Sequence, residues 1–183
     1  YRKAFEQLKQ SGYLFPCTCT RRDLENAVAA PHSEGGETLY PGTCRTQFKP
    51  PEENCNWRFR VPDGEPITFE DAHYGPQQFV AGNDFGDFPV WQKDGIPSYQ
   101  RAGVVDDAAQ IISEVVRGAD LLVSTARQLL LYRALELTTP SFYHCDLMLD
   151  AEGNRLAKRD QALSLRELRS NGKTPGEVRN DWI

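Results

Sequence analysis

The spacing of three cysteines restricts the fold of this chain more than any other feature. The stretch CTCTRR places Cys17 and Cys19 one residue apart, and the stretch LYPGTCR places Cys44 shortly after a Pro-Gly turn. Side chains alternate along an extended segment, so Cys17 and Cys19 are expected to point the same way. The turn before Cys44 suits a chain that folds back onto this pair. Three interpretations are open: a disulfide, a metal site, or unpaired buried thiols.

Cysteine usage favours a metal site over a disulfide. The chain has five cysteines, an odd number, and shows no secretory signal, so a disulfide framework is disfavoured. Zinc binds four ligands in a tetrahedron and prefers thiolates in structural sites. From the residues alone the fourth ligand is open between Cys55, His32 and Tyr40. A tyrosine must lose its proton to bind zinc, which a metal ion can enforce. Unpaired buried cysteines remain the alternative.

Composition predicts a soluble globular protein. Of the 183 residues, 39% are hydrophobic and 26% are charged, which is typical of a folded domain. No apolar run approaches the ~20 residues that span a bilayer, so we expect no membrane partner. The net charge of −5 gives no overall field that favours nucleic acid, although a local basic patch could bind it. The helical pattern begins at Tyr1, so we expect the chain to start inside a larger protein.

Hydrophobic spacing predicts helices and strands in an order that changes midway along the chain. The predicted helices are 1–11, ending at Gly12, then 21–30, 124–137 and 163–170. The predicted strands are 57–61, 67–69, 78–81, 89–92 and 142–149. The β-rich first half and the α/β second half predict a division into residues 1–90 and 91–183.

A basic stretch near the C-terminus is suited to binding phosphate. Arg155, Lys158 and Arg159 lie within the sequence GNRLAKR, directly after a predicted strand and turn. Three cations in five residues could cradle a polyphosphate and stabilise developing negative charge. A solvated basic turn before a helix is the alternative.

A second stretch offers groups for binding a carboxylate or a cation. Asp106 and Asp107 follow an apolar pair, where they would either cap a helix or line a cleft at the carboxyl end of a strand. Arg117 follows the apolar pair Val115–Val116 and would either clamp a carboxylate or lie exposed at a helix start.

Together these segments resemble the second half of the catalytic domain of glutamyl-tRNA synthetases, which are class I aminoacyl-tRNA synthetases. The matching strings keep their order and spacing along residues 88–165: SY and VVDD (98–107), VRGADLL (116–122), STARQ (124–128) and LAKR (156–159). The resemblance implies an α/β fold, namely the C-terminal part of a Rossmann-type catalytic domain with a zinc-bearing, partly β inserted segment.

The cysteine motif resembles one subgroup of this family, the short glutamyl-queuosine tRNA(Asp) synthetases that lack an anticodon-binding domain. Bacterial charging enzymes often pair Cys-x-Cys with a distant Cys-x-His, but Thr46 occupies the position of that histidine here. The resemblance implies a zinc ion held by four residues, Cys17, Cys19, Tyr40 and Cys44.

The same resemblance implies an activity. Such enzymes use ATP, with Mg²⁺, to convert glutamate into glutamyl-adenylate, and then transfer the glutamyl group to the queuosine base of tRNA(Asp). Tyr99 and Arg117 match the glutamate-binding residues. Lys158 matches the lysine of the KMSKS-type loop, which binds ATP and stabilises the transition state, with Arg155 and Arg159 beside it. We therefore expect a cytoplasmic monomer that acts on glutamate, ATP and tRNA.

The sequence departs from the family pattern in three ways. Gly103 stands where discriminating enzymes commonly have Asn, and Ala157 replaces the serine of the loop. The chain also contains no HIGH-type signature, which should precede Tyr1, so we expect an enzyme fragment that is inactive alone. Two alternatives stay open: a fragment of an ordinary glutamyl-tRNA synthetase that charges tRNA(Glu), and a zinc-stabilised RNA-binding module without catalysis.

Overall fold

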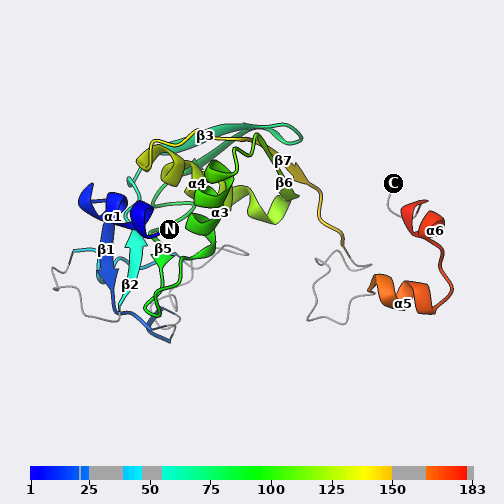
Figure 1. The fold of residues 1–183 in the computed structure, drawn as a ribbon, viewed down its shortest axis with the longest axis horizontal. Helices are drawn as coiled ribbons and strands as arrows, with labels where there is room; N and C mark the ends of the chain where they lie inside the picture. The colour runs from blue at the N-terminus through cyan, green and yellow to red at the C-terminus, as the bar shows by residue number, and fades with distance from the viewer. Residues whose placement is uncertain (21, 25–38, 47–54, 150–163, 181–183) are drawn as a thin grey trace. The chain divides into compact units, whose positions relative to one another are not determined.

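The computed structural model describes residues 1–20, 22–24, 39–46, 55–149 and 164–180 (Figure 1). The chain forms two compact units, Tyr1–Cys145 and Asp146–Ile183. Among the described residues, no helix is both long and apolar enough to cross a membrane. Most of the predicted helix 21–30, together with His32 and the basic stretch 153–159, lies outside the described residues.

The first unit begins with helix α1 and a three-stranded antiparallel sheet. In spatial order the strands are β1 (Leu14–Cys17), β2 (Asn56–Phe59) and β5 (Phe88–Trp91). Helix α1 (Arg2–Gln10) buries Phe5 and Leu8, as its spacing predicts. The Phe5 ring packs edge-on against Trp57 of β2 at 5.5 Å and against Trp91 of β5 at 5.0 Å between centroids. These aromatic contacts fix the helix against the sheet whose first strand ends at Cys17.

A second, four-stranded sheet combines antiparallel and parallel pairing. In spatial order the strands are β4 (Gly75–Val80), β3 (Pro66–Asp71), β7 (Ser141–Cys145) and β6 (Glu114–Gly118). Strands β3 and β4 form an antiparallel hairpin, while β7 runs parallel to both β3 and β6. The register pairs Arg117 with His144, which places a predicted site residue beside a buried histidine. This sheet contains strands from both sides of residue 90.

Two helices pack together and connect the sheets (Figure 1). Helix α3 (Tyr99–Ala109) follows β5, and helix α4 (Leu122–Ala134) follows a short 3-10 turn, η1 (Ala119–Leu121), after β6. Helix α4 is buried on nearly every side, and Leu130 and Leu131 lie in its core-facing surface. Helix α3 contacts both β5 of the first sheet and helix α4.

The described helices and strands confirm most of the predicted elements, with one clear error. The interpretation that Asp106 and Asp107 cap a helix was wrong, because these residues lie inside helix α3 near its end. Asp106 accepts a hydrogen bond from the Tyr1 hydroxyl, and Asp107 accepts one of 3.3 Å from the Tyr132 hydroxyl. These partners are distant in sequence, so the local pattern gave no sign of them.

In the second unit, the described residues form two six-residue helices, α5 (Leu165–Ser170) and α6 (Pro175–Asn180). Ser164 and Glu167 form a capping box at the start of α5, in which each side chain bonds the backbone N–H of the other residue. The predicted helix 163–170 is therefore confirmed, whereas α6 was not predicted.

Candidate functional site

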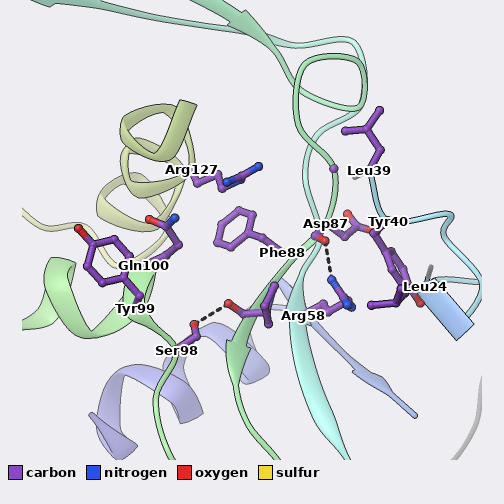
Figure 2. Close-up of a pocket in the computed structure, with 12 residues that line it drawn as sticks. Leu24, Leu39, Tyr40, Arg58, Asp87, Phe88, Ser98, Tyr99, Gln100 and Arg127 are labelled. Atoms are coloured by element: carbon purple, nitrogen blue, oxygen red, sulfur yellow. Dashed lines mark hydrogen bonds between the residues drawn. The ribbon is translucent and has the colours of Figure 1, made fainter. Parts of the chain in front are cut away.

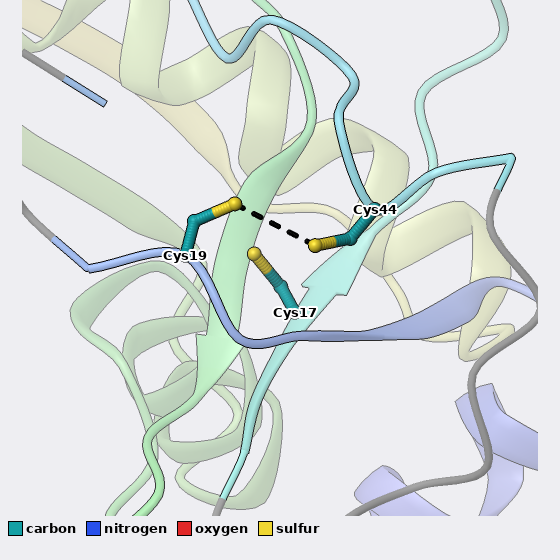
Figure 3. A group of neighbouring side chains, drawn as sticks. All are labelled: Cys17, Cys19 and Cys44. Carbon is teal, nitrogen blue, oxygen red and sulfur yellow. Dashed lines mark hydrogen bonds between the residues drawn. The ribbon is translucent and has the colours of Figure 1, made fainter. Parts of the chain in front are cut away.

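Three cysteine sulfurs converge in the first unit (Figure 3). The Sγ atoms of Cys17, Cys19 and Cys44 all lie within 4.8 Å of one another, and those of Cys19 and Cys44 are 3.5 Å apart. Cys17 ends β1, and Cys19 two residues later faces the same side, as the alternation of an extended chain predicts. Cys17, Cys19 and Cys44 form no disulfide, so the cluster is a group of three thiols.

The Tyr40 hydroxyl occupies the fourth position around these sulfurs. It lies 3.5 Å from the Cys17 sulfur and 3.8 Å from the Cys19 sulfur, and it accepts a hydrogen bond of 2.8 Å from the Cys44 N–H. A tetrahedral zinc site with sulfur and oxygen ligands has ligand–ligand edges of about 3.5 to 3.8 Å. The donor set and its spacing therefore fit zinc. Among the described residues, Cys55 is buried but is not part of this group.

Arg58 of β2 supplies a fixed positive charge beside the cluster. Its side chain is buried, its Nε–H donates to the Cys17 sulfur at 3.4 Å, and its guanidinium lies 4.0 Å above the Tyr40 ring. Its Nη1–H donates to the Asp87 carbonyl at 2.9 Å, which holds the guanidinium in place (Figure 2). A buried cation in this position would offset negative charge gathered on the cluster.

The pKa values of the thiols and the phenol explain why the cluster would bind a metal ion. Burial and the sulfurs of Cys44 and Cys17 raise the pKa of the Cys19 thiol to about 11, and burial also raises the pKa of the Tyr40 phenol. Burial acts in the same direction on Cys44, but hydrogen bonds from the Thr18 backbone and from Tyr40 lower its pKa to about 7. These groups therefore do not ionise together at neutral pH unless a divalent cation balances their charge.

Tyr99 and Arg117 form a second group of predicted site residues. Arg117 is the second-last residue of β6 and is partly buried, and its guanidinium lies 5.5 Å above the Phe142 ring. Burial lowers the pKa of Arg117, and a hydrogen bond and charge interaction with Tyr99 oppose this shift. The structure thus brings the tyrosine at the start of α3 to the arginine at the end of β6.

A pocket of about 250 Å³ is lined by residues next to the cysteine cluster and by Tyr99 of the second group (Figure 2). Tyr40 and Arg58 line it on the side of the cysteines, and Tyr99 and Arg127 line it on the side of the helices. The Ser98 hydroxyl donates to the Pro89 carbonyl at 2.5 Å, which fixes the start of α3 to β5. The pocket therefore offers aromatic surfaces together with charged groups.

Gly103 lies one turn after Tyr99, where α3 meets α4. A Cβ atom at this position would come within 3.3 Å of the Gln128 Nε2 atom. The absence of a side chain lets the Gln128 amide of α4 approach the backbone of α3.

The third predicted group, Arg155, Lys158 and Arg159, lies outside the described residues. Sequence reasoning in turn missed three residues around Arg117, namely Asp71, Thr125 and His144. Asp71 ends the strand PITFED and His144 lies in the strand SFYHC, and neither string marks these residues as part of a site.

Comparison with known proteins identifies the family. The family model described as tRNA synthetases class I (E and Q), catalytic domain, matches residues 1–180. The chain belongs to this family. The mixed α/β fold seen in the two sheets is that of a class I synthetase catalytic domain.

Individual relatives of this class I synthetase chain carry more specific names. It is 44% identical over 165 residues to the glutamyl-Q tRNA(Asp) synthetase of Geobacter sulfurreducens, which aligns 90% of this chain and 52% of that protein. It is 45% identical over 189 residues to the protein of the same name from Symbiobacterium thermophilum, with 97% and 57% aligned. The chain spans about half the length of the curated relatives it matches.

A solved structure supports the same fold. The glutamate tRNA ligase of Elizabethkingia meningosepticum, in complex with its amino acid, matches with a TM-score of 0.71 at 28% identity. The match covers 87% of this class I synthetase chain and 35% of the ligase.

Proposed function

We propose that this chain is part of an ATP-dependent ligase that activates glutamate and transfers it to the queuosine base of tRNA(Asp). The observation that carries this proposal is the 44–45% identity, over at least 90% of the chain, to proteins named glutamyl-Q tRNA(Asp) synthetase. The reaction would take place in the cytoplasm, where ATP and tRNA are found.

Glutamate would be held by Arg117 and Tyr99. A guanidinium offers paired N–H donors that match a carboxylate, and partial burial strengthens this interaction by excluding water. The Tyr99 hydroxyl hydrogen-bonds Arg117, and residue Tyr99 as a whole is 59% exposed. Its side chain is therefore accessible to a ligand that binds the guanidinium. The two side chains would bind and orient the amino acid without taking part in bond making.

The ATP phosphates, with Mg²⁺, would be held by the basic stretch. Lys158 would place its ammonium against the phosphates as charge moves onto the leaving pyrophosphate, and Arg155 and Arg159 would add to the local positive field. This assignment rests on the match of LAKR to the family's loop.

A zinc ion would be held by Cys17, Cys19, Cys44 and Tyr40. The ion would supply the positive charge that lets the three thiols and the phenol ionise together. Four protein ligands would leave no open coordination position, so the role would be structural. The residues themselves would join the end of β1 to the loop 39–46, and Arg58 would balance their negative charge.

The proposal is tested with the full-length protein. We expect ATP–pyrophosphate exchange that depends on glutamate, and transfer of labelled glutamate to tRNA(Asp) that carries queuosine. The same tRNA lacking queuosine is the matched control and should accept none. Charging of tRNA(Glu) at its acceptor end would instead identify an ordinary glutamyl-tRNA synthetase, and no exchange with any amino acid would identify an RNA-binding module.

A further inference from the structure

A buried chain of polar contacts runs from the β3–β4 turn to Arg117. The Asp71 carboxylate and the His144 ring are almost completely buried, and the His144 Nδ1 atom lies 2.6 Å from Asp71 Oδ2. On the other side of the ring, Nε2 lies 3.1 Å from the Arg117 Nε atom. The strand order β3-β7-β6 creates this row, because each of the three residues lies at the carboxyl end of its strand or next to it.

The contacts set the hydrogen-bond roles of the two His144 ring nitrogens. An arginine Nε carries a hydrogen and can only donate, so the His144 Nε2 atom accepts from Arg117, and the Thr125 hydroxyl lies 3.1 Å from the same Nε2 atom. On the other side of the ring, Nδ1 donates to the Asp71 carboxylate. Backbone N–H groups of His73 and Tyr74 donate to the other carboxylate oxygen at 3.1 and 2.9 Å, so Asp71 itself is held in place.

These contacts decide which edge of Arg117 is available to a ligand. Its Nε–H is used by His144, and one hydrogen of Nη2 is used by the Thr125 hydroxyl. A carboxylate can approach a guanidinium along the Nε–Nη2 side or end-on along Nη1 and Nη2. Because the Nε–H is already engaged, the side approach is blocked, and a carboxylate has to approach end-on at the Nη atoms, where Tyr99 also hydrogen-bonds Arg117.

We propose that His144, oriented by Asp71, is a positioning residue that makes Arg117 bind the carboxylate of the amino-acid substrate end-on. This inference rests on the proposed function, since it takes Arg117 to be the glutamate-binding arginine. It adds two residues, on strands β3 and β7, that set the geometry of the amino-acid site without touching the substrate.

Two replacements of His144 separate its two hydrogen bonds. His144→Asn keeps a donor near the position of Nδ1, facing Asp71, and removes the acceptor for Arg117. His144→Gln places an amide oxygen near the position of Nε2 and so keeps that acceptor. In the full-length protein we expect His144→Asn to raise the KM for glutamate about tenfold to a hundredfold, as loss of a hydrogen bond to a charged group does. His144→Gln should stay within about threefold of the parent, and neither variant should change the KM for ATP.

Arg117→Lys provides the reference that distinguishes this inference from the proposed function. It should raise the KM for glutamate, and adding His144→Asn to it should have no further effect, because the Nε–H is already absent. If Arg117→Lys raises the KM and His144→Asn alone does not, the positioning role is overturned and the proposed function stands. If Arg117→Lys also leaves the KM unchanged, the glutamate assignment itself is overturned. A fall in melting temperature in both His144 variants, with equal changes in both KM values, would show a purely structural histidine.

Discussion

At the scale of single residues, Tyr40 decides how the cysteine cluster is completed. Its hydroxyl is the oxygen that faces the sulfurs, and its ring also packs against Phe15 at 6.1 Å between centroids. Tyr40→Phe removes the oxygen and keeps the ring, so packing is preserved while one proposed ligand is lost. We expect the variant to bind zinc at least about tenfold more weakly, measured by competition with a chromogenic chelator. Tyr13→Phe, outside the cluster, is the control, and equal zinc retention in both variants would exclude Tyr40 as a ligand.

Asp71 makes stability depend on pH in the acid range. Burial raises its pKa, but hydrogen bonds from His144 and the backbone of Tyr74 and His73 outweigh this and lower the pKa to about 2 from 3.8. Asp71 therefore stabilises the fold above pH 3.8, and this contribution of up to about 2 kcal/mol is lost as the pH falls towards 2. We expect the difference in unfolding free energy between the parent and Asp71→Asn to shrink between pH 5 and pH 3 in urea titrations.

Asp87 is the matched control, because its shift has the opposite sign. Burial is the main cause that raises its pKa, against a hydrogen bond from the Val61 N–H. As the pH falls, the unfolding free energy of the parent should therefore increase relative to that of Asp87→Asn. Any loss of metal in acid affects both comparisons alike, so parallel behaviour of the two variants would contradict this assignment of the shifts.

At the scale of elements, four helices end in the same way. After each of the helices α1, α3, α4 and α5, the second residue past the helix end has a positive φ. The backbone N–H of this residue and that of the next residue both donate to carbonyls in the last turn. The residues of positive φ are Gly12, Ile111, Glu136 and Gly172. Glycine adopts this conformation without strain, whereas a residue with a Cβ atom pays about 1–2 kcal/mol for it.

Glu136 gives a direct test of this strain. Its φ is 57° and it is exposed, so Glu136→Gly removes the strain without removing a buried contact. We expect the unfolding free energy to rise by about 0.5–1 kcal/mol, after allowing for the larger entropy of glycine in the unfolded chain. Gly12→Ala is the mirror-image control and should lower stability by about 1 kcal/mol, since its φ is 76° and nothing lies within 4 Å of an added Cβ atom. A loss of stability in both variants, measured by chemical denaturation, would contradict the strain at Glu136.

The same helix ends explain which elements the sequence could predict. The end of α1 was predicted because Gly12 marks it, whereas the residue of positive φ after α3 is Ile111, which carries no such signal. The cysteine cluster could be predicted because its first two residues are neighbours in one extended segment. The contact between Asp71 and His144 could not, because it joins residues 73 positions apart and depends on the register of β3, β7 and β6.

At the scale of the whole molecule, the residues proposed for function come from every part of the chain. Tyr40 and Tyr99 line one pocket in the first unit, and Arg117 reaches Tyr99 from the second sheet. Lys158 lies in the sequence between β7 and α5. In our proposal, the zinc ligands and the contacts within the sheet stabilise the fold. Lys158, in contrast, stabilises the negative charge that develops on the ATP phosphates during the reaction. The two kinds of residue should therefore respond differently to substitution.

Lys158→Ala tests this distinction in the full-length protein. Removing a group that stabilises developing charge typically costs about a hundredfold to a thousandfold in kcat. We therefore expect glutamate-dependent pyrophosphate exchange to fall by that amount, with the melting temperature and zinc content unchanged, because the lysine does not support the fold in our proposal. Arg166→Ala, an exposed cation in the neighbouring helix α5, is the control and should retain full exchange. A melting temperature that falls together with the rate would assign Lys158 a structural role, and full exchange in Lys158→Ala would remove the stretch LAKR from the ATP site.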